Sequence, residues 1–326
     1  MGYEELITQS KVEIELKKIN VTLETFDTTT LYHVEDLPFT INWIPDVFSD
    51  FRKRVEKDTK VRNLFSAPSS IPSPPIEKLS LPTLHELGLE NYLFDCRAAY
   101  SFKGGESAGI NRMNHYLFET HAIATYKETR NGMIGENYSS KFSAWLAVGC
   151  ISPKMIYHQI KNYESTNVAN ESTYWLIFEL LWRDYFCFIM RKYPTHFFTP
   201  NGINKQKFLK NIHEPFLFEK WKNGQTENDF INANMIELNH TGFMSNRGRQ
   251  NIASYFCHNL KLDWRYGAAY FEQQLIDYDV SSNWCNWAYI AGVGNNPRGV
   301  SVFNMEKQAN DYDKNKSYRN LWLTKN

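Results

Sequence analysis

A run of prolines between Ala67 and Pro82 divides the chain, and it constrains the fold more than any other feature. The five prolines, separated in part by serine, are Pro68, Pro72, Pro74, Pro75 and Pro82. Proline fixes φ and lacks a backbone N–H, so neither a helix interior nor a central strand accommodates such a sequence. We therefore predict a stiff surface linker within residues 66–100.

The residues on the two sides of this linker have different patterns. Residues 19–26 alternate apolar and polar side chains, which predicts a half-buried strand, and the apolar residues of 45–57 fall on one helical face. Beyond about residue 100 the apolar spacing is helical, for example along 174–191 and 249–260. We expect a mainly α protein in three parts: a β-containing fragment (1–65), the linker (66–100) and a large all-α domain (101–326).

Charge and cysteine content exclude several classes of function. Lys plus Arg and Asp plus Glu both number 36, which argues against a non-specific polycation but allows a local basic patch. The five cysteines form no CxxC pair, so no zinc or iron–sulfur site is suggested, and reduced thiols are expected. No membrane span and no signal peptide are visible. We expect a protein that is not secreted, located in the cytoplasm or in a eukaryotic nucleus or organelle.

The residues from Asp277 to Tyr289 combine hydrogen-bonding groups with large aromatic rings. The segment contains Asp277-Tyr278-Asp279 and then Asn283-Trp284-Cys285-Asn286-Trp287-Ala288-Tyr289. Burying these polar groups together is costly unless each finds a partner. A large planar ligand with polar edges would supply those partners, so this segment predicts a binding site.

A second candidate is the aromatic run from Tyr174 to Phe186. Glu179 and Arg183 lie four residues apart and share one helix face, with Trp182 beside Glu179. A solvated ion pair of little energetic value is the alternative. Because the helix is apolar nearly all round, it is expected to be buried, and a buried carboxylate needs a partner such as a ligand.

Two further segments carry groups that suit a phosphate. Tyr138–Ser143 offers three hydroxyl-bearing serines and Lys141 just before an apolar run, although plain helix capping explains them equally well. Asn246-Arg247-Gly248-Arg249-Gln250 places two arginines around a glycine, and arginine binds phosphate bidentately, although a solvated loop is the commoner case. We find no metal-binding helix motif and no GxSxG nucleophile motif.

Taken in order, these segments resemble the photolyase/cryptochrome family, and within it the DASH-type cryptochromes. The resembling strings are Phe-Lys-Gly-Gly-Glu-Ser (102–107), Tyr-Lys-Glu-Thr-Arg-Asn-Gly (126–132), Tyr-Ser-Ser-Lys-Phe-Ser (138–143), Ser-Thr-Tyr-Trp-Leu-Ile-Phe-Glu-Leu-Leu-Trp-Arg-Asp (172–184), Thr-Gly-Phe-Met-Ser-Asn-Arg-Gly-Arg-Gln (241–250) and Ala-Gly-Val-Gly-Asn-Asn-Pro-Arg (291–298), with the Asp277–Tyr289 segment. The resemblance covers nearly the whole chain and is most specific after residue 100.

The resemblance implies that the helical domain holds FAD in a U-shape. Arg249 and Asp277 resemble a salt-bridged pair beside the isoalloxazine ring. Asp279 resembles the acceptor for the imide edge of that ring, and Asn283 the carboxamide that faces N5. The other implied cofactor residues are Tyr126, Ser139, Ser140, Lys141, Phe142, Ser143, Glu179, Arg183 and Asn246.

The implied enzyme is a deoxyribodipyrimidine photolyase. Excited reduced FAD would give an electron to a flipped-out cyclobutane pyrimidine dimer, the ring would split, and the electron would return. The implied lesion pocket is lined by Glu179, Trp182, Asn246, Gln250 and Tyr289, and the expected DNA contacts are Lys141, Arg247 and Arg249. Tyr289 stands where the family often has a tryptophan, which is consistent with a preference for single-stranded DNA.

Two alternatives remain open at this point. One is a blue-light-sensing flavoprotein that signals through flavin photoreduction without repair. The other is a non-enzymatic nucleic-acid binder or a degenerate fragment. The two-histidine signature of the (6-4) photolyases is missing from Ser245–Gln250, which disfavours that lesion.

Photoreduction in this family usually uses a chain of three tryptophans. Trp287 and Trp264 match two of them. The third position falls near Asn211, where the chain has no tryptophan, so Trp221 or a tyrosine would have to substitute.

The beginning of the chain departs most from the family. Relatives carry a complete α/β antenna domain before the linker, whereas Glu4–Phe39 resembles only its last portion. We therefore expect an all-helical FAD-binding domain preceded by a partial α/β antenna remnant. A complete pocket for an antenna pterin such as methenyltetrahydrofolate is not expected unless a second polypeptide supplies the rest.

Overall fold

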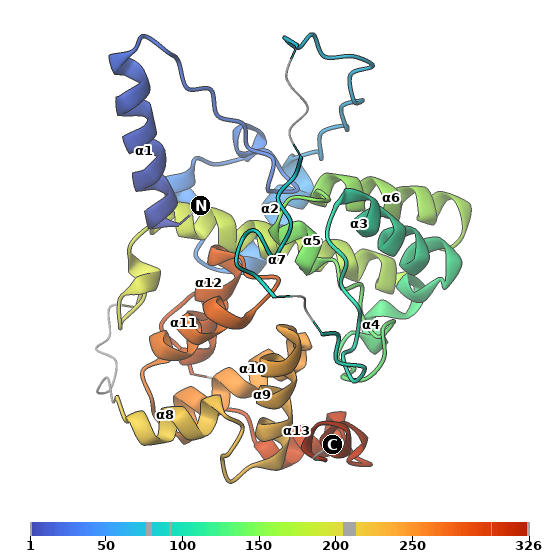
Figure 1. Ribbon diagram of the computed structural model, residues 1–326, viewed down its shortest axis with the longest axis vertical. Coiled ribbons are helices and arrows are strands. Elements are labelled where there is room, and N and C mark those ends of the chain that lie inside the picture. Colours follow the sequence, from blue (N-terminus) through green and yellow to red (C-terminus); the bar gives the residue numbers. More distant parts are fainter. Residues whose placement is uncertain (1, 76–79, 91–92, 205–212, 301, 325–326) are drawn as a thin grey trace.

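The computed structural model describes residues 2–75, 80–90, 93–204, 213–300 and 302–324, and these ranges are built from helices and irregular segments (Figure 1). They contain no β-strand. None of their helices combines the length and the apolar character needed to cross a bilayer. The expectation of a mainly α protein is confirmed for this part of the chain.

The candidate site lies among four helices. They are α7 (Glu171–Lys192), α10 (Asn246–Ser254), α11 (Trp264–Gln274) and α12 (Val280–Ala291). The other α-helices of the described residues are α1 (Tyr3–Lys18), α2 (Phe48–Asp58), α3 (Glu106–Asn114), α4 (Tyr126–Thr129), α5 (Ser143–Ala147), α6 (Pro153–Thr166), α8 (Pro215–Lys222), α9 (Asp229–Thr241), α13 (Met305–Tyr312) and α14 (Ser317–Leu323).

Helix α7 forms the centre of the molecule and contacts α2, α4, α6 and α12 (Figure 1). It starts at a well-formed cap, in which the Asn170 side chain accepts hydrogen bonds from the backbone N–H groups of Ser172 and Thr173. Most of its second half is buried, because its apolar residues surround the axis. A helix packed on this many sides gives a rigid support for side chains that line a cavity.

The strand predicted for residues 19–26 is wrong. These residues adopt irregular, largely exposed backbone, and they follow α1, a helix without a buried residue. A strand needs a partner strand for its N–H and C=O groups, and none exists in the described residues. The α/β character expected for the first 65 residues is therefore not seen in the structure.

The segment before the linker is nevertheless part of the main core. Leu31, Phe51 and Val55 are completely buried in the same hydrophobic cluster as α7. The backbone N–H groups of Leu31 and Tyr32 donate to the two carboxylate oxygens of Asp184, at 2.8 and 2.9 Å. Burial raises the pKa of Asp184 to about 7, although these two hydrogen bonds act in the opposite direction.

The linker contains no helix between Asp58 and Glu106 in the residues that the structure describes. Apolar side chains along it face solvent, with Leu81 90%, Leu93 87% and Ile71 73% exposed. This irregular, solvated path agrees with the prediction from its prolines.

Candidate functional site

Three adjoining cavities lie between α7, α10, α12 and the loop that precedes α5. Their volumes are about 110, 500 and 210 Å³, and we refer to them as the inner, open and loop cavities, respectively. Asn246, at the start of α10, lines all three. The inner and open cavities also share four lining residues, Gln250, Ser282, Asn286 and Ile290. A single elongated ligand could therefore occupy more than one of them.

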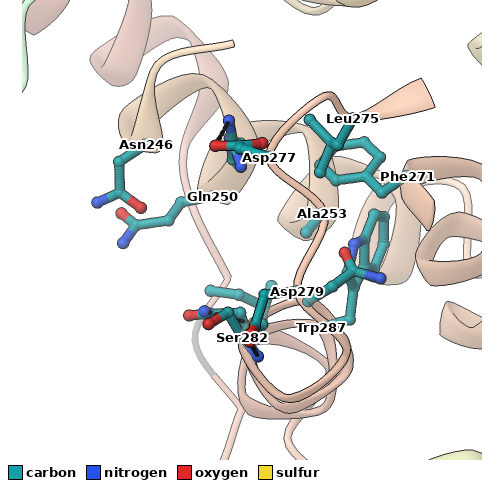
Figure 2. A pocket seen from close by; sticks show the side chains of 13 residues that line it. Asn246, Gln250, Ala253, Phe271, Leu275, Asp277, Asp279, Ser282 and Trp287 are labelled. Atoms are coloured by element: carbon teal, nitrogen blue, oxygen red, sulfur yellow. Dashed lines mark hydrogen bonds and ion pairs between the residues drawn. The ribbon is translucent and has the colours of Figure 1, made fainter. Parts of the chain in front are cut away.

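The inner cavity has a polar side and an apolar side. Figure 2 shows the carboxamides of Asn246 and Gln250 projecting from α10, with Phe271 and Leu275 on the opposite side. Trp287 closes the apolar side and is 2% exposed. A flat aromatic ligand with hydrogen-bonding edges matches such a lining.

Asp277 and Arg249 form the expected ion pair at this cavity (Figure 2). The Arg249 Nη2 atom lies 2.9 Å from Asp277 Oδ2, and Arg249 Nε donates to the Met244 carbonyl oxygen at 2.9 Å. The Asp277 side chain is 1% exposed, and its Oδ1 atom is buried without a hydrogen-bond partner. A buried carboxylate oxygen left unpaired is costly, so a donor from a ligand is expected there.

Asp279 begins α12 and lines the same cavity. Its Oδ1 atom accepts from the Ser282 backbone N–H at 2.8 Å, which caps the helix, and its Oδ2 atom lies 3.6 Å from Arg183 Nη2. Burial alone would raise the pKa of Asp279, but the Arg183 guanidinium and these hydrogen bonds hold that pKa below its ordinary value. The side chain is therefore held as a fixed anion.

Asn283 and Gly267 shape the floor of the inner cavity. The Asn283 Nδ2 atom donates to the Ala268 carbonyl oxygen at 2.9 Å, which fixes the orientation of the amide. A Cβ atom at Gly267 would lie 2.3 Å from Cη2 of Trp287, so only glycine permits the indole to lie there.

The open cavity is walled by Trp182 and Tyr289. Their rings meet edge to face with centroids 6.0 Å apart. Behind Trp182, the Phe48 ring of α2 stacks on the indole at a centroid distance of 3.7 Å and an interplanar angle of 13°. This stacking partner holds the wall in one orientation.

Glu179 also lines the open cavity, and its ion-pair partner is not Arg183, the residue four positions along the same helix. The carboxylate forms an ion pair with Arg130, which comes from the end of α4, and accepts from Trp175 Nε1 at 3.2 Å. Arg183, one turn further along α7, instead donates to the Thr29 carbonyl oxygen. Arg130 is thus a site residue that the spacing argument missed, because its partner lies 49 residues away in sequence.

The loop cavity brings together the residues expected to bind phosphate and ribityl groups. Its lining includes Tyr126, Ser139, Ser140, Phe142 and Ser143. It also shares Arg249 and Asp277 with the inner cavity, and Arg130 and Glu179 with the open cavity. The geometry therefore places both arginines within reach of an anionic group in this cavity.

The cations expected to contact DNA lie in unequal positions. Lys141 is 2% exposed, and its Nζ atom lies 2.9 Å from the centroid of the Tyr138 ring without a hydrogen-bond partner. Burial holds the pKa of Lys141 well below its ordinary value. Arg249 is engaged by Asp277, and Arg247 donates to Asn131 Oδ1 at 3.1 Å. Contact of these three cations with DNA stays a prediction, and Lys141 would have to leave its buried position to make one.

The tryptophans expected to carry electrons are buried. Trp264 is completely buried and donates from Nε1 to the Pro200 carbonyl oxygen at 3.1 Å. Trp221, also completely buried, meets Trp287 edge to face with centroids 6.3 Å apart. The position near Asn211 lies outside the described residues.

The structure also describes no group of three His, Cys, Asp or Glu side chains that could hold a metal, within the ranges given above. A flavin dinucleotide does fit the site. The unpartnered Asp277 oxygen matches the polar edge of the flavin ring, and the indole of Trp287 matches its face. The connected loop cavity matches the phosphates.

Comparisons with known proteins agree with this geometry. Residues 175–325 match the family model described as the FAD binding domain of DNA photolyase. A cryptochrome DASH from Danio rerio is 50% identical over 98% of this chain and 63% of its own length. A cryptochrome DASH from Synechocystis sp. is 47% identical over 98% of this chain and 67% of its own length.

A crystal structure of a Synechocystis sp. cryptochrome superposes with a TM-score of 0.93 at 47% identity, covering 99% of this chain and 67% of that one. The chain thus spans roughly two thirds of the length of the relatives that it matches, a share of 63% for the Danio rerio protein. The chain therefore belongs to the photolyase/cryptochrome family, in the group of DASH-type cryptochromes.

Proposed function

We propose that the FAD-loaded protein repairs cyclobutane pyrimidine dimers by light-driven electron transfer, preferentially in single-stranded DNA. The observation that carries this proposal is the wall shared by the inner and open cavities. Gln250, Ser282, Asn286 and Ile290 line both, so a pyrimidine dimer held in the open cavity would lie against the edge of a ring system in the inner one. Such contact suits electron transfer between two planar groups.

The residues of the inner and loop cavities would hold the cofactor. Arg249 and the free oxygen of Asp277 would bind the polar edge of the flavin, and Asp279 and Asn283 would flank it from α12. The hydroxyls of Ser139, Ser140 and Ser143 would face its phosphate and ribityl groups. When bound, FAD supplies the light absorption and the transferable electron, which no side chain provides.

The residues of the open cavity would hold the lesion. Trp182 and Tyr289 offer an aromatic corner for two linked pyrimidines, and Glu179 offers a carboxylate whose charge Arg130 balances. Extrusion of a dimer costs unstacking energy, which is smallest in a single strand. Tyr289, a smaller wall than tryptophan, leaves room for the lesion but does less to replace lost duplex stacking.

The test uses the purified, FAD-loaded protein with its flavin chemically reduced. A single-stranded oligonucleotide with one thymine dimer is illuminated with blue light, and restored thymines are counted by chromatography. We expect dimer loss in the light only, reduced strongly by Trp182→Ala. Trp43→Ala should leave it unchanged, because Trp43 is 79% exposed and lines none of the three cavities. Absence of repair with fully reduced flavin would overturn the proposal, and intact photoreduction without affinity for the lesion would favour light sensing.

A further inference from the structure

The packing of α11 against α12 places two tryptophans of α12 beside α11. Trp287 lies against Gly267, and Trp264 stands one turn before that glycine. Trp284 stands one turn before Trp287, and the two indoles of Trp264 and Trp284 meet edge to face with centroids 5.8 Å apart. A helical turn rises about 5.4 Å, so Trp284 and Trp287 occupy successive turns of α12, and Trp264 lies one turn before the glycine that Trp287 contacts.

The three indoles differ in their access to solvent. Trp287 and Trp264 are 2% and 0% exposed, whereas Trp284 is half-buried. Trp284 lines an outer cavity of about 520 Å³, separate from the flavin site, together with Phe198, Tyr278 and Glu272. The series therefore runs from the inner cavity to the surface of the protein.

Trp284 also has the chemical surroundings of an electron donor that must lose a proton. Its Nε1–H donates to Glu272 Oε2 at 3.0 Å. The outer cavity contains two more carboxylates, those of Glu4 and Glu5, which favour a transient positive charge. The N–H of Trp264 instead meets a backbone carbonyl, which cannot take up a proton.

A second branch leaves Trp287 through Trp221, but it lacks a proton acceptor. The Trp221 N–H is buried without a partner. The next oxidisable ring, Tyr270, has its centroid 5.6 Å away and donates its hydroxyl to the Asn239 amide oxygen at 2.5 Å. Burial raises the pKa of Tyr270, and an amide is not a base, so oxidation of this phenol would be unfavourable.

We propose that Trp287, Trp264 and Trp284 form an electron relay that ends on Trp284 at the surface, with Glu272 as the acceptor of its indole proton. This relay takes the place of the family's third tryptophan and rests on the proposed function, because it serves a flavin in the inner cavity. Trp287 gives one electron to the light-excited oxidised flavin, Trp264 refills Trp287, and Trp284 refills Trp264. The oxidised Trp284 then passes its N–H proton to Glu272. One electron from a thiol in solution, together with the return of that proton from Glu272, restores the indole, and two oxidised thiols combine to a disulfide.

The experiment compares Trp284→Phe, Glu272→Gln and the control Trp43→Phe in the FAD-loaded protein. Transient absorption should show a long-lived neutral tryptophan radical in the wild type and in the control. Trp284→Phe should lose that signal and slow photoreduction by thiol several-fold. Glu272→Gln should leave an indole radical cation, which decays faster. In the cofactor-free protein, acrylamide quenching of tryptophan fluorescence is compared in the Trp43→Phe background, which lacks the 79% exposed indole of Trp43. Adding Trp284→Phe to this background should lower the quenching further, because a second solvent-accessible indole is lost.

Two results would overturn the relay. One is normal photoreduction in Trp284→Phe, and the other is a loss of the radical signal in Trp221→Phe alone. Dimer splitting by chemically reduced wild-type protein does not need the relay, so it tests the proposed function separately. A protein that photoreduces through Trp284 but splits no dimer would keep the relay and refute the repair.

Discussion

Phe48, a core residue of α2, stacks on Trp182 and so fixes the orientation of one wall of the open cavity. Phe48 contacts three rings, with centroid distances of 5.3 Å to Phe178, 3.7 Å to Trp182 and 5.5 Å to Tyr185. Replacement by leucine keeps an apolar side chain but removes these three aromatic pairs. Each pair contributes about 0.5–1.5 kcal/mol beyond buried area, so Phe48→Leu should lower the free energy of unfolding by about 2–4 kcal/mol.

Phe51, one turn further along α2, provides a matched control. It also contacts three rings, those of Phe39, Tyr185 and Phe188, at 5.8, 5.3 and 6.2 Å, and it does not touch Trp182. Phe51→Leu should therefore cost a similar free energy of unfolding. Only Phe48→Leu should leave the Trp182 ring free to move. The ring would then have to be ordered again when a pyrimidine dimer binds.

The assay is the affinity for an oligonucleotide that contains a thymine dimer, measured well below the unfolding transition. Ordering one side chain costs about 0.5–1.5 kcal/mol, so Phe48→Leu should weaken binding about two- to twelvefold. Phe51→Leu should bind like the wild type. Equal losses in both variants would refute the reasoning, because they would show that general destabilisation, not the orientation of Trp182, lowers the affinity.

Two buried carboxyl groups lead to further predictions. Asp184→Asn replaces one acceptor oxygen by an N–H₂ group opposite the backbone N–H groups of Leu31 and Tyr32. The free energy of unfolding, measured with urea, should therefore fall by about 1–3 kcal/mol. An unchanged free energy of unfolding would contradict this contact. Glu237, buried against the Tyr318 hydroxyl, has its pKa raised by burial from 4.5 to about 7. The folded state therefore holds more protons than the unfolded state, and the free energy of unfolding should fall as pH rises between these two values. Glu237→Gln should reduce that slope, and an unchanged slope would exclude Glu237 as its source.

Patterns within single segments predicted the helical domain and much of the site. The apolar spacing of 174–191 and 249–260 corresponds to most of α7 and to α10 with the turn that follows it. The density of polar and aromatic groups after Asp277 indicated a planar ligand, and the structure places Asp277, Asp279, Asn283 and Trp287 around one cavity. Local periodicity suffices here because each element contributes its residues in one run.

Contacts between distant segments could not be predicted in the same way. The partner of Glu179 is Arg130, and nothing in the spacing of either helix indicates that pairing. The helical face of Phe48 was predicted, but not the ring on which it stacks. The alternation at 19–26 indicated a strand, yet alternation stabilises a strand only when a second strand provides hydrogen bonds.

The protein should tolerate a break in its exposed linker, because residues 30–58 before the linker are anchored in the core. Before the linker, Asp46 pairs with Lys192 and Asp27 with Arg191, and Phe51 lies in the core. All residues that line the three cavities come after the linker, whereas Phe48, which supports Trp182 of the open cavity, comes before it. A cut within residues 80–90 should therefore leave two pieces that stay associated by contacts on α7, so this stretch suits fragment complementation or the insertion of a reporter domain.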